Sequence, residues 1–406
     1  MGWNRLSRRK ELVAGIFLLA MAVSHLVMVM KLTPYLRNGY PNFASFYTAG
    51  TMVRTGQAAA LYDLPAQYEM QKQFAPNVSI RQAALPNIHP PFEALLFAPL
   101  TLIPYWPSYL LWTALNLALL ALSLKILRIG PGPRGVTPIF LALAAAGFYP
   151  VVTSLIQGQD CVLLLFLFVL ALVALEKGWD TAAGLLLAGG MFRFQLVLPV
   201  ILLLAIRRWR ILLGFLPMSV LLGVLSVGMV GWAGVTGYLH FLISMEKGGA
   251  GGSIVASGMP NLRGLLSGLP GVSADSGAIF VATMLCSVAV LGIAGYCILL
   301  QKNSIRFTFT LATVAALLVS YHSLTYDLSL LLPAILLLFA DDEHATERSR
   351  QVDILLLLLL YALPRFELLG PWSSPFVWFA ALLFWLFWKG NLAGRLTEHA
   401  IGTQAL

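Results

Sequence analysis

Long apolar runs, many of them close to the thickness of a lipid bilayer, are the feature that most restricts what this 406-residue chain can fold into. Only 11% of the residues are charged and 59% are hydrophobic, whereas a soluble domain carries about 25% charged residues. In hydrocarbon, only helices and closed barrels satisfy their own backbone hydrogen bonds. Runs of roughly 20 residues therefore predict an all-α fold, a polytopic bundle of transmembrane helices.

The apolar stretches that count as candidate spans number about twelve. They cover residues 11–32, 105–127, 138–156, 160–176, 180–192, 195–206, 211–230, 278–300, 306–321, 323–340, 352–366 and 374–389. The two stretches beside Arg193 are too short for a full crossing, so we expect half-helices or a broken element there. We interpret residues 1–406 as one integral membrane domain.

Basic residues between the apolar runs indicate the orientation of the chain. With the N-terminus in the cytoplasm, 17 of the 26 Lys and Arg residues fall on the cytoplasmic side, as the positive-inside rule requires. Both termini are therefore predicted to be cytoplasmic. The net charge of +9 implies no nucleic-acid partner, because the basic residues form no patch with interleaved aromatic residues.

Two long segments are then predicted at the outer face, residues 33–104 and 231–276. In the first, Asn42 stands where a helix N-cap is favoured and Gly56 where a helix ends, so we expect a short helix between them. A second short helix is expected at Pro65. Both are too short to span a bilayer, so we expect them to lie along the membrane surface. The proline-bounded apolar run that follows is expected to be interfacial or re-entrant.

Several motifs follow one another in a particular order. They are "FYTAG…GQAAALYD", "HPPFEALLFAPLTLIPYWPSYLLWTALNLALL", "QGQDCVLLLFLFVLAL", "AAGLLLAGGMFRFQLVLPVILLLAIRRWR", "MPNLRGLL" and "SYHSLTYDLSLLLPAILLL". In this order they resemble glycosyltransferase family 87, over roughly residues 40–340. The resemblance implies a GT-C type of fold. It also implies transfer of a hexose, mannose foremost, with inversion, from a polyprenyl-phosphate donor to a lipid-linked or cell-envelope acceptor.

The resemblance further implies the partners and the location of the protein. The partners are membrane lipid, the polyprenyl-phosphate donor and a glycan or glycolipid acceptor, and the location is the bacterial cytoplasmic (inner) membrane. No cofactor is implied, and the oligomeric state stays open. The residues themselves indicate no metal site, because the carboxylates are scattered without a DxD pair and the three cysteines lie within apolar runs.

The chain departs from the family's pattern at two positions. An acid that serves as general base is expected at Asn42, and an amide cannot usefully accept a proton near neutral pH. Arg193 stands where Lys is expected, and a guanidinium can hold a phosphate through two oxygens. A charge between apolar runs needs a polar cavity or a partner, so we expect Arg193 to bind the donor phosphate or to pair with Asp160 or another acid.

Two pairs of a histidine and an acid are further candidates. His322 and Asp327 lie at a predicted outer turn, where they either join helices or act on the donor. In the second case, His322 would contact phosphate or sugar, and Asp327 would be a base or would orient that histidine. His89 is assigned to the donor phosphate. Glu93, beside an apolar run, is a candidate replacement base, with a salt bridge or interfacial exposure as the alternative.

Five residues are assigned to binding the sugar or the acceptor, namely Tyr47, Gln159, Asp160, Asn261 and Arg263. Gln159 and Asp160 can equally cap the next helix, and Asn261 and Arg263 also have a structural alternative. Asp63 is expected to cap a turn.

Two other interpretations compete with an active transferase. A transporter or lipid flippase is also polytopic, but it tends to contain internal repeats with paired broken helices, and no repeat is evident in the sequence. A catalytically degenerate member of the family, which binds polyprenyl phosphate without turnover, is supported by Asn42.

Overall fold

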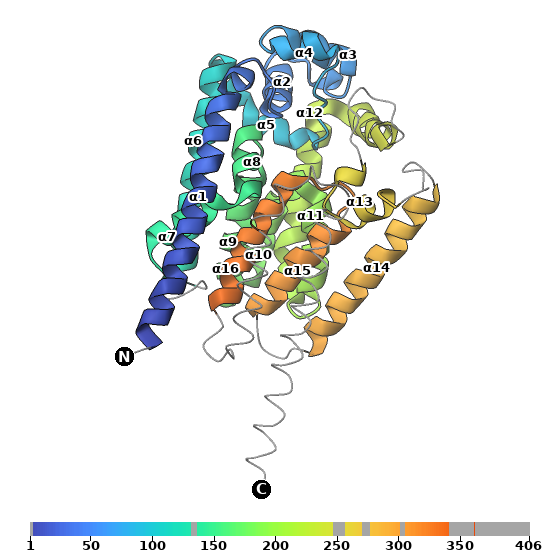
Figure 1. Cartoon of the computed structure of the whole chain (residues 1–406). Helices are drawn as coiled ribbons and strands as arrows, with labels where there is room; N and C mark the ends of the chain where they lie inside the picture. The colour runs from blue at the N-terminus through green and yellow to red at the C-terminus, as the bar shows by residue number, and fades with distance from the viewer. Residues whose placement is uncertain are drawn as a thin grey trace. The chain divides into compact units, whose positions relative to one another are not determined.

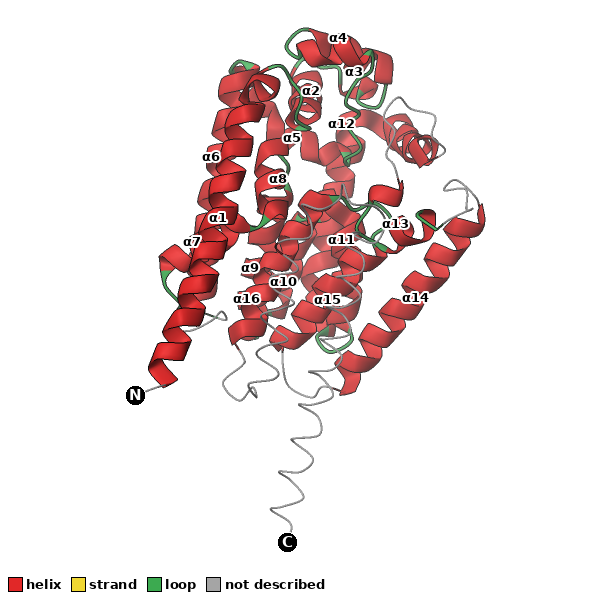
Figure 2. Cartoon of the chain, viewed as in Figure 1, coloured by secondary structure: helices red, strands yellow, loops and turns green. Residues whose placement is uncertain are grey.

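The computed structural model describes residues 3–130, 136–246, 256–269, 277–300, 305–340 and 361. Every regular element in these ranges is a helix, which confirms the all-α fold (Figure 2). The chain forms two compact units that alternate along the sequence. Unit 1 comprises Met1–Ile126, Gly135–Phe166 and Pro217–Ile254, and unit 2 comprises Leu127–Arg134, Leu167–Leu216 and Val255–Leu406. One integral membrane domain over residues 1–406 stays a prediction.

The described residues contain candidate membrane spans, but a number near twelve is not confirmed. Four described segments are long and apolar enough to cross a bilayer, namely Leu12–Arg37, Tyr105–Ile129, Trp209–Ser244 and Gly277–Leu300. Two bent pairs of shorter helices raise the number to as many as six. A helix such as Cys161–Glu176, with 16 residues, is about 24 Å long, which is less than the roughly 30 Å of hydrocarbon. The predicted spans 352–366 and 374–389 lie outside the described residues, apart from Tyr361.

Paired broken helices were named above as a feature of transporters, and the structure contains two bent helix pairs. The break expected near Arg193 is present, since α10 (Asp180–Gly189) meets the segment Met191–Ala205, which contains α11 (Phe194–Ala205), at 64°. Unit 1 contains a second break, where α7 (Pro138–Gly147) meets α8 (Tyr149–Gln157) at 69°. There the ring of the buried His25 contacts the carbonyl oxygen of Ala146 at 2.9 Å. A break in a membrane helix is tolerated when a neighbour satisfies the freed backbone group in this way.

Unit 1 combines long helices with a group of short ones (Figure 1). The long ones are α1 (Trp3–Arg37), α6 (Tyr105–Ile129) and α12 (Leu212–Glu246), of which α12 is broken at Gly231. The short ones are α2 (Phe43–Arg54), α3 (Leu64–Lys72), α4 (Pro76–Arg81) and α5 (Ala94–Phe97). The run after Pro90 forms only short helical turns up to Leu102, so it does not span.

Helix α2 is packed inside the protein. The helix starts after Asn42 and ends before Gly56, as predicted, but nine of its 12 residues are buried. Gly50 lies so close to α5 that a Cβ atom there would be 2.8 Å from the carbonyl carbon of Phe97. This helix is therefore enclosed by protein, and its placement along the membrane surface stays a prediction. For α3, Pro65 in the first turn and the Asp63 cap both agree with prediction, since Asp63 Oδ1 accepts from Ala66 N–H at 3.4 Å.

Unit 2 is arranged around α15 (Ile305–Val319), in which every residue from Thr308 to Val319 is buried. It packs against α11, α14 (Gly277–Leu300) and α16 (Leu331–Ala340). The short helix α13 (Leu262–Ser267) packs beside α14. The break between α10 and α11 and the turn between α15 and α16 carry the polar side chains of this unit.

Candidate functional site

Two buried glutamines of α3 hold the segment that carries His89. Gln71 exchanges two hydrogen bonds of 2.8 Å with the backbone N–H and carbonyl of Leu85, as a neighbouring β-strand would. Gln67 accepts from the backbone N–H of Asn87 at 3.0 Å and donates to the carbonyl of Leu61 at 2.7 Å. Both glutamines are fully buried. An extended segment without regular structure thus receives a fixed path through neutral hydrogen bonds.

His89 itself is fixed from three sides. Tyr62 donates its hydroxyl proton to the His89 carbonyl at 2.7 Å, and Tyr238 donates to the carbonyl of Ile88 at 3.2 Å. The His89 ring meets the ring of Phe46 edge to face, with centroids 4.9 Å apart. Burial is the main cause that raises the pKa of Tyr62, so its hydroxyl remains a hydrogen-bond donor. The imidazole therefore has little freedom to turn.

The turn that carries Asp160 is held just as firmly. Trp112 donates its indole N–H to the carbonyl of Gly158 at 2.9 Å, and Tyr109 donates to the carbonyl of Ile156 at 2.9 Å. Gly158 has φ +59°, and a Cβ atom there would be 2.7 Å from that of Phe43. Only glycine suits both conditions. Asp160 follows as the residue that precedes α9 (Cys161–Glu176).

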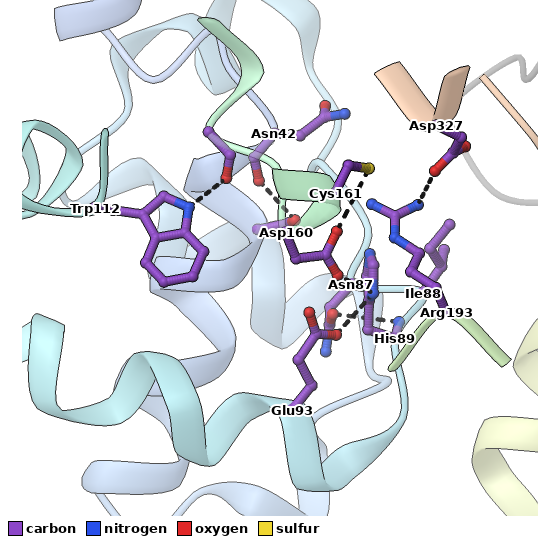
Figure 3. A network of polar contacts seen from close by, with 12 residues as sticks. Asn42, Asn87, Ile88, His89, Glu93, Trp112, Asp160, Cys161, Arg193 and Asp327 are labelled. Carbon is purple, nitrogen blue, oxygen red and sulfur yellow. Dashed lines mark hydrogen bonds and ion pairs between the residues drawn. The ribbon is translucent and has the colours of Figure 1, made fainter. Parts of the chain in front are cut away.

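These two supports bring His89, Glu93 and Asp160 together, and we call these three residues the His–carboxylate cluster. His89 Nδ1 lies 2.7 Å from Glu93 Oε2 and 3.6 Å from Asp160 Oδ2, and all three side chains are buried. Figure 3 shows the side chains turned toward one another. One imidazole and two carboxylates with ligand atoms within 4.8 Å of one another can exchange a proton, and they are also a donor set that a divalent cation can use.

In unit 2, Arg193 lies at the break between α10 and α11 and is 1% exposed. Its Nη1 atom is 3.3 Å from Asp327 Oδ1, and the guanidinium lies 5.4 Å from the centre of the Tyr326 ring. Asp327 Oδ2 accepts the backbone N–H of Leu324 at 2.8 Å. Asp327 is thus engaged by a cation and by a backbone donor. This geometry favours orientation of Arg193 over the predicted role of a catalytic base.

A second arginine and a histidine belong to the same unit. Arg263, in α13, lies 4.3 Å from the centre of the Tyr321 ring, and its Nη1 atom is 3.5 Å from the Tyr321 carbonyl oxygen. Burial, together with the charges of Arg193 and Arg263, lowers the pKa of His322 to about 4. His322 is therefore neutral at pH 7. Because the charges of both guanidiniums act on this imidazole, we group Arg193, Arg263 and His322 and call them the arginine cluster.

Other predicted site residues have structural contacts. Asn261 caps α13 by accepting from Gly264 N–H at 2.8 Å and donates to the carbonyl of Ser320 at 2.8 Å. Tyr47 donates its hydroxyl proton to the carbonyl of Ile103 at 2.9 Å and packs among aromatic rings. These bonds place both side chains in the framework.

Asn42 and Gln159 belong to unit 1. The Asn42 side chain makes no capping bond, while its backbone N–H donates to Gln157 at 3.1 Å. Gln159, at 2% exposure, is buried in the turn beside Asp160. The sequence had assigned roles to Asn42 and Gln159, but it gave no sign of the residues that hold the cluster, chiefly Gln67, Gln71, Tyr62, Tyr109 and Trp112.

The comparison with protein families agrees with this picture. A model of glycosyltransferase family 87 matches residues 87–321, which is more than half of the chain. The chain belongs to glycosyltransferase family 87. The family match contains the whole His–carboxylate cluster and both arginines, and it ends at Tyr321, just before His322. No curated protein and no solved structure matches the chain. The membership identifies a membrane glycosyltransferase, with the resemblance seen in the motifs confirmed.

Proposed function

We propose that this family 87 member transfers a hexose, mannose foremost, from a polyprenyl-phosphate donor to a lipid-linked or cell-envelope acceptor, with inversion at the anomeric carbon. The arginine cluster is the observation that carries the proposal. It brings two buried guanidiniums, those of Arg193 and Arg263, to one neutral imidazole. A guanidinium binds phosphate through two parallel hydrogen bonds, so two of them close together suit the phosphate of a lipid-linked donor.

The chemistry assigned to this cluster is stabilisation of the leaving group. As the bond between the sugar and the phosphate breaks, negative charge develops on the departing phosphate. Fixed guanidiniums stabilise that charge without rearranging, and they do so most strongly where water is excluded. His322, neutral at pH 7, can add a hydrogen bond to a phosphate or to a sugar hydroxyl. Asp327 holds Arg193 in place.

A lipid-linked donor suits a protein with four to six candidate membrane spans. A polyprenyl chain is soluble only in the bilayer, so its enzyme must accept it from there, whereas a glycan acceptor can arrive from water. The proposed location is the bacterial cytoplasmic membrane, with both termini in the cytoplasm and transfer at the outer face. The proposal requires no metal and no cofactor.

Binding of short-chain polyprenyl monophosphate to the protein in nanodiscs tests the donor assignment. Arg193→Leu combined with Asp327→Asn removes the cation without leaving an unpaired carboxylate, and Arg263→Gln removes the second cation. Each variant should bind about tenfold more weakly or worse, because a hydrogen bond to a charged group contributes about 1.5–3 kcal/mol. The exposed Arg210, changed to Gln, is the matched control and should bind as wild type does. The corresponding polyprenyl alcohol should not compete.

Saturable binding that both variants lose would support the donor and justify assays with sugar-charged lipid. Equal binding by the wild type and by both variants would reject the arginine cluster as the phosphate site. A folded wild type that binds no polyprenyl phosphate would reject the donor class itself.

A transporter or flippase is the second candidate, and the two bent helix pairs favour it, since transporters often bind substrate at such breaks. Vesicles reconstituted with the protein separate the two functions. Transport predicts movement of labelled polyprenyl phosphate across the bilayer without formation of a glycoside. Transfer predicts a new glycoside that carries the label of the donor sugar.

A further inference from the structure

The His–carboxylate cluster addresses the question raised by Asn42, where the family's pattern calls for a base. We propose that His89 is the general base of the transfer reaction, and that Glu93 and Asp160 are positioning residues that act through it. This inference rests on the proposed function, because it concerns the acceptor in that same reaction. It replaces the expectations that His89 binds phosphate and that Glu93 is itself the base.

The contact between His89 and Glu93 determines which ring nitrogen can act. Glu93 Oε2 lies 2.7 Å from Nδ1, and the negative charge of a carboxylate at that distance favours a proton on Nδ1 over one on Nε2. In a neutral imidazole the other nitrogen, Nε2, then carries the lone pair. A carboxylate that orients a histidine from one side makes the opposite nitrogen the base, as in hydrolases with a catalytic triad.

Asp160 strengthens the same arrangement. Its Oδ2 atom is 3.6 Å from Nδ1, on the side of the ring that Glu93 also faces. When Nε2 takes up a proton, the imidazolium that forms is flanked by two carboxylates in a buried setting, where opposite charges attract more strongly than in water. Hydrogen bonds of Tyr62, Gln67 and Trp112 fix the backbone segments that carry His89 and Asp160, and so keep the three side chains close together.

The proposed step is balanced as follows. The acceptor hydroxyl gives its proton to Nε2 of His89 while its oxygen forms a bond to the anomeric carbon. The bond between that carbon and the donor phosphate oxygen breaks, and its electron pair leaves with the phosphate. The proton passes from His89 to water after the glycoside departs. Neither an oxidant nor a further reactant is needed.

Other candidates fit the role of base less well. Asn42 is an amide, and its side chain makes no capping bond that would fix it. Asp327 is engaged by Arg193 and by a backbone N–H. Glu93 already directs an oxygen to the His89 ring, so a proton that it received would weaken the shortest contact in the cluster.

The experiment uses the full chain in nanodiscs, with short-chain polyprenyl-phosphate mannose as donor and a bacterial membrane lipid extract as the acceptor pool. His89→Gln should lower kcat by about 100-fold to 10,000-fold, the usual contribution of a general base, while binding of polyprenyl phosphate stays within about threefold of wild type. The exposed His240, changed to Gln, should leave kcat unchanged.

Glu93→Gln is the variant that separates positioning from mere structure. Without this carboxylate the imidazolium is less stable, so the acidic limb of the rate profile should move about 1–3 pH units toward lower pH, along with a fall in kcat. Asp160→Asn should move it in the same direction but less. A matched control, Glu69→Gln on the exposed surface of α3, should not move it.

Four outcomes would overturn the inference. Full kcat in a folded His89→Gln variant would exclude the histidine as base while leaving the proposed function intact. A Glu93→Gln variant that loses activity with an unmoved acidic limb would reduce Glu93 to a structural role. Activity that chelators abolish and Mn²⁺ or Zn²⁺ restores would show that the cluster is a cation site. A wild type that binds donor but transfers no sugar would reject the proposed function together with this inference.

Discussion

The two polar clusters of this protein are built on opposite principles. In unit 1 the His–carboxylate cluster joins one imidazole to two carboxylates, and a surrounding frame of neutral groups fixes the backbone segments that carry it. In unit 2 the arginine cluster joins two guanidiniums to a neutral imidazole, and a charged partner, Asp327, pairs with Arg193. A cluster rich in carboxylates suits proton transfer, and a cluster rich in guanidiniums suits an anion.

This difference predicts which substitutions should reduce the stability of each cluster most. A buried ion pair loses most when only one partner is removed, because the other charge is left uncompensated. A frame of neutral bonds loses less for each bond, but every lost bond also loosens the segment that it held. The variants below therefore test charge in unit 2 and the frame in unit 1.

The largest effect is expected at the ion pair. Arg193→Leu alone leaves Asp327 buried without its cation and should destabilise the protein by about 3–5 kcal/mol. Adding Asp327→Asn should restore most of that loss, because the amide oxygen can still accept from Leu324 N–H. Thermal unfolding in detergent, followed by tryptophan fluorescence, measures both variants. Equal loss in the single and the double variant would mean that the pair is not what stabilises this region.

The frame of unit 1 should give the next largest effect. Gln71→Leu leaves both the N–H and the carbonyl of Leu85 unpaired, at about 1–3 kcal/mol for each group. Hydrogen exchange over residues 85–89 should rise at the same time, because this segment has lost one of its two glutamines. The exposed Gln73, changed to Leu, is the control of the same chemistry. Unchanged exchange in Gln71→Leu would show that the frame is redundant.

The arginine cluster also predicts a dependence on pH. The pKa of His322 is lowered from 6.5 to about 4, so the unfolded chain binds more protons than the folded one between these values. Stability due to this group is therefore complete above pH 6.5 and falls as the pH drops toward 4. His322→Gln should lose less stability than wild type between pH 7 and pH 4.5. The same loss in both proteins would contradict the lowered pKa of His322 in the folded protein.

Sequence patterns predicted the local features of the fold and much of the site, but not the distant contacts. The end of α2 before Gly56 and the cap at Asp63 follow from short-range preferences of Gly and Asp, and the break near Arg193 follows from two apolar runs too short to cross a bilayer. The contact between His89 and Asp160 could not be predicted, because 70 residues separate them and local sequence patterns do not encode contacts at that separation.

The burial of two helices, α2 and α3, also could not be predicted from the sequence. In α3, Gln67 and Gln71 are fully buried and bond to the backbone of distant segments. In α2, nine of the 12 residues are buried. Burial of this kind is set by tertiary neighbours, which a single helix does not encode.

The smallest effect is expected at Asn42, and it bears directly on the comparison between the clusters. If His89 is the base, an acid at position 42 adds nothing to turnover, so Asn42→Asp should change kcat by less than about threefold. The same substitution puts a carboxylate beside the N-terminus of α2, where the helix dipole favours it by about 0.3–1 kcal/mol. A slight rise in unfolding temperature with unchanged kcat is therefore the expected pair of results. A large gain in kcat would mean instead that the chain is a family member that lost its base at position 42, and the His–carboxylate cluster would then be part of the framework.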